Sequence, residues 1–219
     1  MSRFVVSEDL VKLSAGNGVV TVTVNRPEKA NSLTSDMLKL LRDGFNDLAI
    51  DDTLRAMVIT GAGDRVFCAG ADLTTLYDDQ DGSDLWSEMT EALLNIPFPT
   101  IAAINGPCIG GGMSLALGCD IRLAVSQARF SYPVLKNNVI PGQYDVDRLH
   151  QLIGSGRAAV ILLGGDEVPS EEALAWGLVD RVVPHDSLDE ACRSLSAIAT
   201  VSDGTHLKTL KSMLKKCPS

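Results

Sequence analysis

Short apolar runs separated by turn residues dominate the chain before residue 126. Residues 20–24 read Val-Thr-Val-Thr-Val, and this alternation of apolar and polar side chains predicts a half-buried strand. The pair Asn17-Gly18 favours a two-residue hairpin turn, so residues 11–13 are expected to belong to the partner strand. Three short, mainly apolar runs predict further, buried strands at residues 56–60, 100–104 and 121–125.

Segments whose apolar residues recur at helical spacing lie between these runs or after them. Thr34 or Ser35 can cap a helix whose apolar residues recur every three to four positions from Met37 to Leu48. A glycine-rich helix start lies at residues 110–112. The remaining expected elements are helices with apolar stripes at 146–153 and 158–163, a short helix from residue 170, a last strand at 178–183, and helices at 187–199 and 205–216.

This alternation of strands and helices indicates an α/β architecture with largely parallel strands. The chain has 219 residues, of which 45% are hydrophobic and 21% charged, so it can form one sizeable domain with a buried core. We expect a spiral-like core over residues 1–186 and a short C-terminal helical segment over residues 187–219, and not two independent domains.

Charge and cysteine content exclude several classes of protein. The formal net charge is −9, and an acidic body repels nucleic acid and anionic membranes, so neither is an expected partner. Five cysteines without C-x-x-C spacing argue against a disulfide framework and a zinc site, and the three histidines stand apart. Without a signal-like or membrane-spanning apolar run, a cytoplasmic location is expected. A solvated last helix explains the cluster Lys208, Lys211, Lys215 and Lys216.

Two segments of small residues are candidates for chemistry. Residues 67–73 read Phe-Cys-Ala-Gly-Ala-Asp-Leu, and their small side chains let another group approach the backbone closely. Residues 105–114 contain three consecutive glycines that open a helix after a strand. The free N–H groups of such a helix start suit a phosphate or a developing oxyanion. Each segment alone is equally explained by a tight turn.

A serine hydrolase is an alternative. Residues 112–116 read Gly-Met-Ser-Leu-Ala and differ from the G-x-S-x-G nucleophile elbow at the last position. Asp145 with His150, or Asp180 with His185, stands in the right chain order to complete a triad. A helix-buried serine that bonds a backbone carbonyl explains the same pattern.

Taken together, the two segments resemble the crotonase (enoyl-CoA hydratase/isomerase) superfamily. Residues 67–73 are similar to its first oxyanion loop, and residues 104–120, with Gly-Gly-Gly and Gly-Cys-Asp, to its second. Residues 25–33 resemble the segment beside bound CoA, and residues 173–183 resemble a late helix-strand segment. The resemblance implies a crotonase-like spiral of repeated β-β-α units with a short helical tail.

The resemblance also implies an acyl thioester of coenzyme A or of a carrier protein as substrate, with no separate cofactor and no metal. By position, the backbone N–H groups of Ala71 and Gly111 would form the oxyanion hole for the thioester carbonyl. The residues implied to border the CoA or acyl part are Lys29, Ala69, Asp72, Leu73, Gly110, Ser114, Tyr132 and Val134. Of these, Lys29 is better explained as a flexible surface side chain.

The chain departs from the resemblance where hydratases carry two glutamates that position and activate water. Those positions fall at Ser114 and Val134, which cannot act as carboxylate acids or bases, so ordinary hydration is not expected. The resemblance implies that residues 140–149 lie near the acyl α-carbon, so Asp145 in this segment is the expected proton shuttle, with its pKa raised by desolvation. Tyr144 is a hydrogen-bonding alternative and Tyr132 a lesser candidate. A helix N-terminal turn, in which Asp145 satisfies free N–H groups, is an equal alternative.

An enoyl-CoA isomerase-type proton shuttle is therefore the expected function, because isomerisation needs one carboxylate that moves one proton. An acyl-thioester decarboxylase or hydrolase of the same fold is one alternative, and a non-catalytic thioester-binding or scaffold subunit is another. The resemblance implies a homotrimer or hexamer. The chain ends early for the superfamily, which leads us to expect a weaker trimer and room for a bulkier acyl group.

Overall fold

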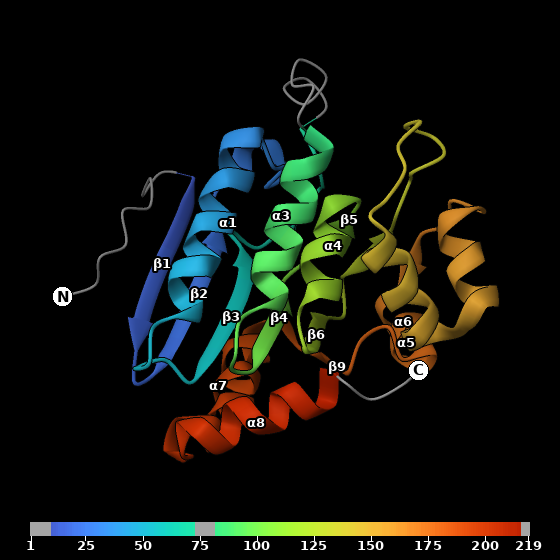
Figure 1. Ribbon diagram of the computed structural model, residues 1–219. Coiled ribbons are helices and arrows are strands. Elements are labelled where there is room, and N and C mark those ends of the chain that lie inside the picture. Colours follow the sequence, from blue (N-terminus) through green and yellow to red (C-terminus); the bar gives the residue numbers. More distant parts are fainter. Residues whose placement is uncertain (1–9, 73–81, 216–219) are drawn as a thin grey trace.

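The computed structural model describes residues 10–72 and 82–215, and a six-stranded sheet runs through it (Figure 1). The strand order is β1-β2-β3-β4-β6-β9. β1 and β2 are antiparallel and every other neighbouring pair is parallel, in agreement with the predicted α/β architecture. The strands are β1 (Val11–Gly16), β2 (Val19–Val24), β3 (Ala56–Gly61), β4 (Thr100–Ile104), β6 (Ile121–Val125) and β9 (Arg181–Val183).

The hairpin that joins β1 to β2 forms at the predicted turn. Asn17 and Gly18 have φ of 52° and 77°, the positive values that the tightest hairpin turns require. In β2, Val20, Val22 and Val24 are buried, whereas the residues between them are partly exposed. The alternation in the sequence therefore determines which face of β2 packs against the core.

Two helices, α1 (Ser35–Ala49) and α3 (Gly82–Leu94), lie side by side over the strands β2 to β4 (Figure 1). α1 agrees with the predicted helix, and the Thr34 side chain caps it by accepting a hydrogen bond from the Met37 N–H at 3.3 Å. α3 has no counterpart among the predicted elements, although its buried residues recur at helical spacing as Leu85, Met89, Ala92 and Leu93.

Two β-β-α units follow α3. In each unit, a strand of the main sheet leads into a short strand of a second sheet and then into a helix. The first unit is β4, β5 (Cys108–Ile109) and α4 (Gly111–Gly118), and the second is β6, β7 (Arg129–Ser131) and α5 (Gln143–Leu162). The second sheet has the order β5-β7-β8, with β8 at Val168–Pro169. These units agree with the spiral that the resemblance implies.

The last part of the described chain is mainly helical. α5 changes direction at Gly154, whose φ of 80° and ψ of 162° are not helical. α6 (Ser170–Trp176) leads to β9, which is shorter than the strand expected at residues 178–183. α7 (Leu188–Val201) contacts β3, β4 and β6, and α8 (Gly204–Lys215) follows it below the sheet in the view of Figure 1.

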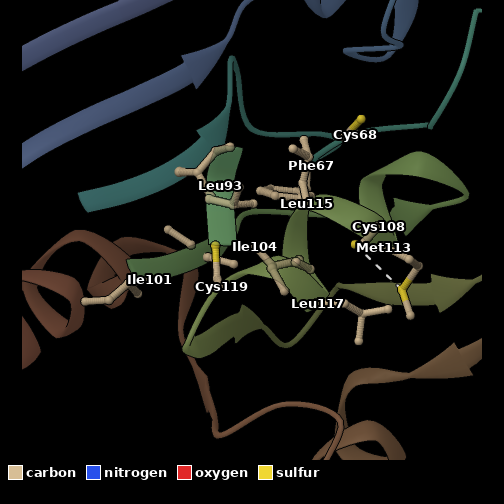
Figure 2. Close-up of a cluster of buried hydrophobic side chains, with 14 of the residues drawn as sticks. Phe67, Cys68, Leu93, Ile101, Ile104, Cys108, Met113, Leu115, Leu117 and Cys119 are labelled. Carbon is tan, nitrogen blue, oxygen red and sulfur yellow. Dashed lines mark hydrogen bonds between the residues drawn. The ribbon is translucent and has the colours of Figure 1, made fainter. Parts of the chain in front are cut away.

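The core around β4 and α4 holds the start of α4 in place (Figure 2). Residues 112–118 are all buried, so most of this helix has no solvent-exposed face. A Cβ on Gly118 would lie 2.6 Å from Leu93 Cδ2 of α3, which shows how closely the two helices pack. Close packing on every side leaves α4 little freedom to move. In Figure 2, Leu115 and Leu117 of α4 pack in the same cluster as Phe67, Ile101 and Ile104 from other segments.

Lys211 fastens α8 to the chain just before β4 and β6. Its Nζ donates to the Phe98 carbonyl at 2.7 Å and pairs with Asp120 Oδ2 at 2.7 Å, while its side chain is only 7% exposed. We expect Lys211→Met to lower the free energy of unfolding by about 2 kcal/mol. Breaking a buried pair typically costs about 3–5 kcal/mol, and water screens part of this cost because the Asp120 side chain is 35% exposed. Urea denaturation measures the change.

Lys208→Met is the matched control on the same helix. Lys208 Nζ lies 2.7 Å from Asp52 Oδ1, but the two side chains are 41% and 86% exposed. Because a surface ion pair of this kind contributes little, the control should leave the urea midpoint unchanged. Equal losses in the two variants would contradict a specific stabilising role for Lys211.

Candidate active site

The two small-residue segments singled out in the sequence lie next to each other. Cys68 and Cys108 form a parallel β-bridge. The Ile109 N–H donates to the Cys68 carbonyl at 2.9 Å, and the Phe67 N–H donates to the Pro107 carbonyl at 3.1 Å. These backbone hydrogen bonds hold the start of the first segment against the residues that precede α4.

Glycines allow the two backbones to touch. Gly70 has a φ of +89°, and a Cβ on it would lie 2.8 Å from the Gly111 nitrogen and 2.9 Å from the Ile109 carbonyl oxygen. A Cβ on Gly112 would lie 2.4 Å from the Cys68 carbonyl oxygen. Side chains at these positions would force the segments apart, so the close approach depends on glycine.

Two backbone amides flank this contact. Leu33 donates its N–H to the Gly70 carbonyl at 2.7 Å and accepts from the Asp72 N–H at 2.8 Å, so the Ala71 N–H between them faces the other edge of the segment. Gly111 is the first residue of α4, where N–H groups have no partner within the helix. Neither the Ala71 nor the Gly111 amide has a hydrogen-bond acceptor among residues 10–72 and 82–215.

Trp86 of α3 covers Gly111 from one side. A Cβ on Gly111 would lie 2.0 Å from Cη2 of the indole ring, and the ring is partly exposed. The indole therefore borders the space next to the free Gly111 amide. The sequence pattern does not single out Trp86, because nothing in the chain near it marks a contact with a helix that begins 25 residues later.

The first segment is anchored to the chain that precedes α1. The Ala69 N–H donates to the Ala30 carbonyl at 3.0 Å. Arg26 Nη1 lies 2.7 Å from Asp72 Oδ2, and both side chains are largely buried. The Asp72 carboxylate therefore holds the first segment in place through Arg26. This structural contact is separate from the role beside CoA that the resemblance implies for Asp72.

Two further residues implied to border CoA are less well defined. Lys29 is exposed at the end of the 3-10 helix η1 (Pro27–Lys29), as expected for a flexible surface side chain. Leu73 lies outside the described residues.

Three buried polar side chains meet beside α4. Ser114 Oγ and Tyr132 OH each donate to Asp145 Oδ2 at 2.6 Å, and the two hydroxyl oxygens lie 3.0 Å apart. Ser114, Tyr132 and Asp145 are only 3%, 7% and 4% exposed. Distances of this length are typical of hydroxyl groups that donate to an ionised carboxylate. The other carboxylate oxygen, Oδ1, is buried and has no hydrogen-bond partner in the described part of the chain.

Burial controls the protonation of this cluster. It raises the pKa of Asp145 above its ordinary value of 3.8, and the hydrogen bonds from Ser114 and Tyr132 oppose part of that shift because they stabilise the carboxylate. Burial and the nearby charge of Asp145 raise the pKa of Tyr132, so its hydroxyl stays protonated. The cluster therefore combines one carboxylate of raised pKa with two neutral hydroxyl donors.

The cluster adjoins the glycine-rich start of α4. Ser114 lies three residues after Gly111, which places it about 4.5 Å further along the helix axis and near the same face. Tyr132 follows β7 directly, and the Gly110 N–H donates to the Ser131 carbonyl at 2.9 Å. The Asp145 carboxylate is thus held near the turn whose Gly111 amide is free.

Comparison with family models identifies the group to which the chain belongs. A model described as enoyl-CoA hydratase/isomerase matches residues 14–218. The chain belongs to the enoyl-CoA hydratase/isomerase family. This match confirms the family that the sequence motifs indicate.

Similar proteins of this family include the putative enoyl-CoA hydratase/isomerase YngF of Bacillus subtilis, 35% identical over 89% of this chain and 77% of that protein. The short-chain-enoyl-CoA hydratase of Clostridium acetobutylicum is 34% identical over 81% of this chain and 70% of its own length. A solved structure of a monofunctional enoyl CoA isomerase from M. smegmatis is similar with a TM-score of 0.83 and 33% identity, over 94% of this chain and 92% of that chain. Pseudomonas aeruginosa DspI is similar with a TM-score of 0.91 and 32% identity, over 98% and 89%. These structures confirm the predicted fold.

Within the enoyl-CoA hydratase/isomerase family, this chain has no carboxylate at the two positions that the resemblance assigns to hydratase glutamates. Ser114 occupies one, and Val134 occupies the other. Val134 is 7% exposed, and its N–H donates to the Tyr132 carbonyl at 2.7 Å. Asp145, from the first turn of α5, brings a carboxylate into contact with Ser114 instead.

The structure changes the ranking of the two tyrosines. Tyr132 hydrogen bonds to Asp145, whereas the Tyr144 hydroxyl lies 3.4 Å from the Leu117 carbonyl oxygen and is not part of the cluster. Tyr132 and Ser114 lie 13 and 31 residues before Asp145 in the chain. No local pattern could have indicated that these three side chains meet.

Two alternative interpretations are wrong. The serine triad is not assembled, because Ser114 bonds to Asp145 directly, Asp180 Oδ2 pairs with Arg122 at 2.9 Å, and His150 is exposed on α5. The Asp145 carboxylate does not cap the N-terminus of α5 either, because it accepts from side-chain hydroxyls and not from backbone N–H groups.

Other chemistries gain no support from the described residues of this family member. No group of three His, Cys, Asp or Glu side chains within residues 10–72 and 82–215 could hold a metal ion. Burial raises the pKa of Cys68 to about 12, so this thiol beside the glycine contact stays protonated and is a poor nucleophile.

No helix in the described part of the chain has the length and apolar character needed to cross a membrane.

Proposed function

We propose that this member of the enoyl-CoA hydratase/isomerase family is an isomerase-type enzyme that moves the double bond of an enoyl-CoA through an enolate. The buried Asp145 carboxylate carries this proposal. It is placed beside the glycine-rich turn, whereas the positions of the hydratase glutamates hold Ser114 and Val134. Isomerisation needs one group that carries one proton, while hydration also needs groups that activate water.

The proposed oxyanion hole consists of the Ala71 and Gly111 amides. Removing a proton from the carbon next to the thioester moves negative charge onto the carbonyl oxygen. Two fixed N–H donors, one at the positive end of α4, stabilise this charge more than they stabilise the neutral thioester. The freedom of both amides from acceptors within the described residues and the rigid packing of α4 support this assignment.

Asp145 is proposed as the proton carrier. As a carboxylate it removes a proton from C2 of a 3-enoyl-CoA, and as a carboxylic acid it returns that proton to C4 of the dienolate, which gives a 2-enoyl-CoA. Its raised pKa supports this role, because a base transfers protons best when its pKa lies near the working pH. No separate cofactor enters the reaction, because coenzyme A is part of the substrate.

Substrate binding and assembly complete the proposal. Lys29, Ala69, Asp72 and Gly110 would border the CoA part, and a homotrimer or hexamer in the cytoplasm is the proposed state. Large exposed apolar side chains support self-association: Leu135 is 59%, Ile140 88% and Leu163 70% exposed. Light scattering coupled to size-exclusion chromatography measures the mass, and a monomer across the accessible concentrations would contradict the proposed assembly.

The experiment that tests the function compares two substrates. Purified protein should convert a trans-3-enoyl-CoA to the 2-enoyl-CoA, which absorbs in the near ultraviolet, and should hydrate a 2-enoyl-CoA at least about 100-fold more slowly. Efficient hydration would contradict the proposal. Calorimetric binding of CoA without turnover of any acyl-CoA would favour the scaffold alternative, and loss of carbon dioxide or release of free CoA would favour a decarboxylase or hydrolase.

A further inference from the structure

The geometry points to Ser114 and Tyr132 as positioning residues that leave Oδ1 of Asp145 as the atom that exchanges the proton. This inference rests on the proposed proton-carrier role of Asp145 and names the atom and the partners that role requires. Three observations carry it: both hydroxyls contact the same carboxylate oxygen, both contacts are short, and the second oxygen has no partner among the described residues.

The number of protons in the cluster limits where another proton can bind. The three oxygens Ser114 Oγ, Tyr132 OH and Asp145 Oδ2 form a triangle with edges of 2.6, 2.6 and 3.0 Å. Two hydroxyl protons fill the two short edges, and the longer edge holds none. A proton added to Oδ2 would have to displace one of these donors, so the next proton binds to Oδ1.

The surroundings of Oδ1 explain why it is reactive. A buried carboxylate oxygen without a donor loses its hydration and gains nothing in return, which favours taking up a proton. The two hydroxyl groups counter this tendency through Oδ2, because they stabilise the ionised form. The hydrogen bonds to Oδ2 therefore stabilise the ionised carboxylate, while burial of Oδ1 without a donor increases its tendency to bind a proton.

The fixed carboxylate also determines the path of the proton. In the forward step the C2–H bond breaks, its electron pair moves toward the thioester oxygen, and an O–H bond forms at Oδ1. In the second step that O–H bond breaks and a C–H bond forms at C4. Charge and atoms balance within the substrate and Asp145, and the protons of Ser114 and Tyr132 stay where they are.

Few other titratable groups face the cluster. On the elements packed against Asp145 within the described residues, the groups that interact with it or its partners are Ser114 on α4, Tyr132 after β7, Cys108 on β5, and Tyr144 and Arg148 on α5 itself. Burial raises the pKa values of Cys108 and Tyr144, so both stay neutral near pH 7. Arg148 interacts with Tyr144.

The test removes one donor at a time. In Tyr132→Phe and in Ser114→Ala the ionised form of Asp145 loses a hydrogen bond, so its pKa should rise by about one unit. Activity requires the ionised form, so the acid limb of the kcat/KM profile should move to higher pH by the same amount. At a pH above the acid limbs of both the wild type and the variant, kcat of the variant should be about tenfold to 100-fold lower than that of the wild type. KM should change less than about twofold, because the substitution affects the orientation of the carboxylate.

A direct titration separates this inference from the proposed function. Carbon-13 NMR of labelled aspartate, with the Asp145 signal assigned from Asp145→Asn, reports the Asp145 pKa without turnover. The matched control is Ser196→Ala on α7, which also deletes a buried serine hydroxyl, here one that donates to the Cys192 carbonyl at 2.9 Å. It should leave the Asp145 pKa unchanged.

The outcomes are distinct. A raised Asp145 pKa in both donor variants but not in Ser196→Ala supports Ser114 and Tyr132 as positioning residues of the carboxylate. A wild-type protein that isomerises no 3-enoyl-CoA would overturn the proposed function, and with it proton exchange at Oδ1, whatever the pKa result. An active wild type whose Asp145 pKa and pH profile stay unchanged in Tyr132→Phe and Ser114→Ala would overturn the inference and leave the proposed function intact.

Discussion

Asp145→Asn is expected to lower kcat for conversion of a 3-enoyl-CoA to a 2-enoyl-CoA by about 10²–10⁴. Asparagine has nearly the same shape and its carbonyl can still accept from Ser114 and Tyr132, but it cannot carry a proton at neutral pH. Binding of the thioester should change little, because the proposed amide donors lie on other segments. Steady-state kinetics and calorimetric binding of a saturated acyl-CoA measure the two effects.

Asp147→Asn is the matched control in the same turn of α5. Asp147 is exposed, and its carboxylate accepts from Gln143 Nε2 at 2.8 Å, so its loss should not affect the rate. Burial raises the pKa of Asp145, so wild-type protein loses unfolding free energy as the pH rises through that pKa, whereas Asp145→Asn does not. The variant should therefore melt no lower than wild type near pH 7. Wild-type activity in Asp145→Asn would remove Asp145 from the mechanism.

Gly70→Ala is expected to lower kcat/KM by about 10²–10³, the usual cost of losing one oxyanion donor. The new Cβ would lie 2.8 Å from the Gly111 nitrogen, so it would displace the amide at the start of α4 or block access to it. A positive φ of +89° adds backbone strain. Enoyl-CoA kinetics, with circular dichroism to verify folding, measure the effect.

Gly63→Ala controls for the strain alone. Gly63 has a similar φ of +79°, but the nearest atom to its added Cβ would be Pro27 Cβ at 3.8 Å. This variant should lose stability and keep its rate. Equal losses of activity in the two glycine variants would mean that the close approach of Gly70 to the Gly111 amide is not required for catalysis.

Much of the fold could be predicted because it depends on local patterns. The Asn17-Gly18 turn, the alternation in β2 and the Thr34 cap all act over a few residues, and each forms where expected. The strands of the second sheet span only two or three residues, which is too short for an apolar period to be visible. Their positions depend on pairing between segments that lie far apart in the chain.

Part of the candidate site could likewise be predicted from the sequence, and part could not. The two amides at Ala71 and Gly111 could be selected because the motifs around them are contiguous, and their roles as an oxyanion hole stay a prediction. Asp145 could be singled out as a carboxylate in a segment that the resemblance places near the acyl group. The contacts that Ser114 and Tyr132 make with it could not be predicted, because Ser114, for example, reaches Asp145 only through the packing of α4 against α5.

The proposed site also separates two tasks between backbone and side chains. Stabilisation of the enolate depends on main-chain amides whose positions follow from glycine contacts between two segments. Proton transfer depends on side chains at only a few positions, carried by α4, α5 and the residue after β7. Exchanging those side chains could therefore redirect an enolate toward a different product without rebuilding the scaffold that forms it, which makes residues 114, 132 and 145 natural targets for changing the reaction by design.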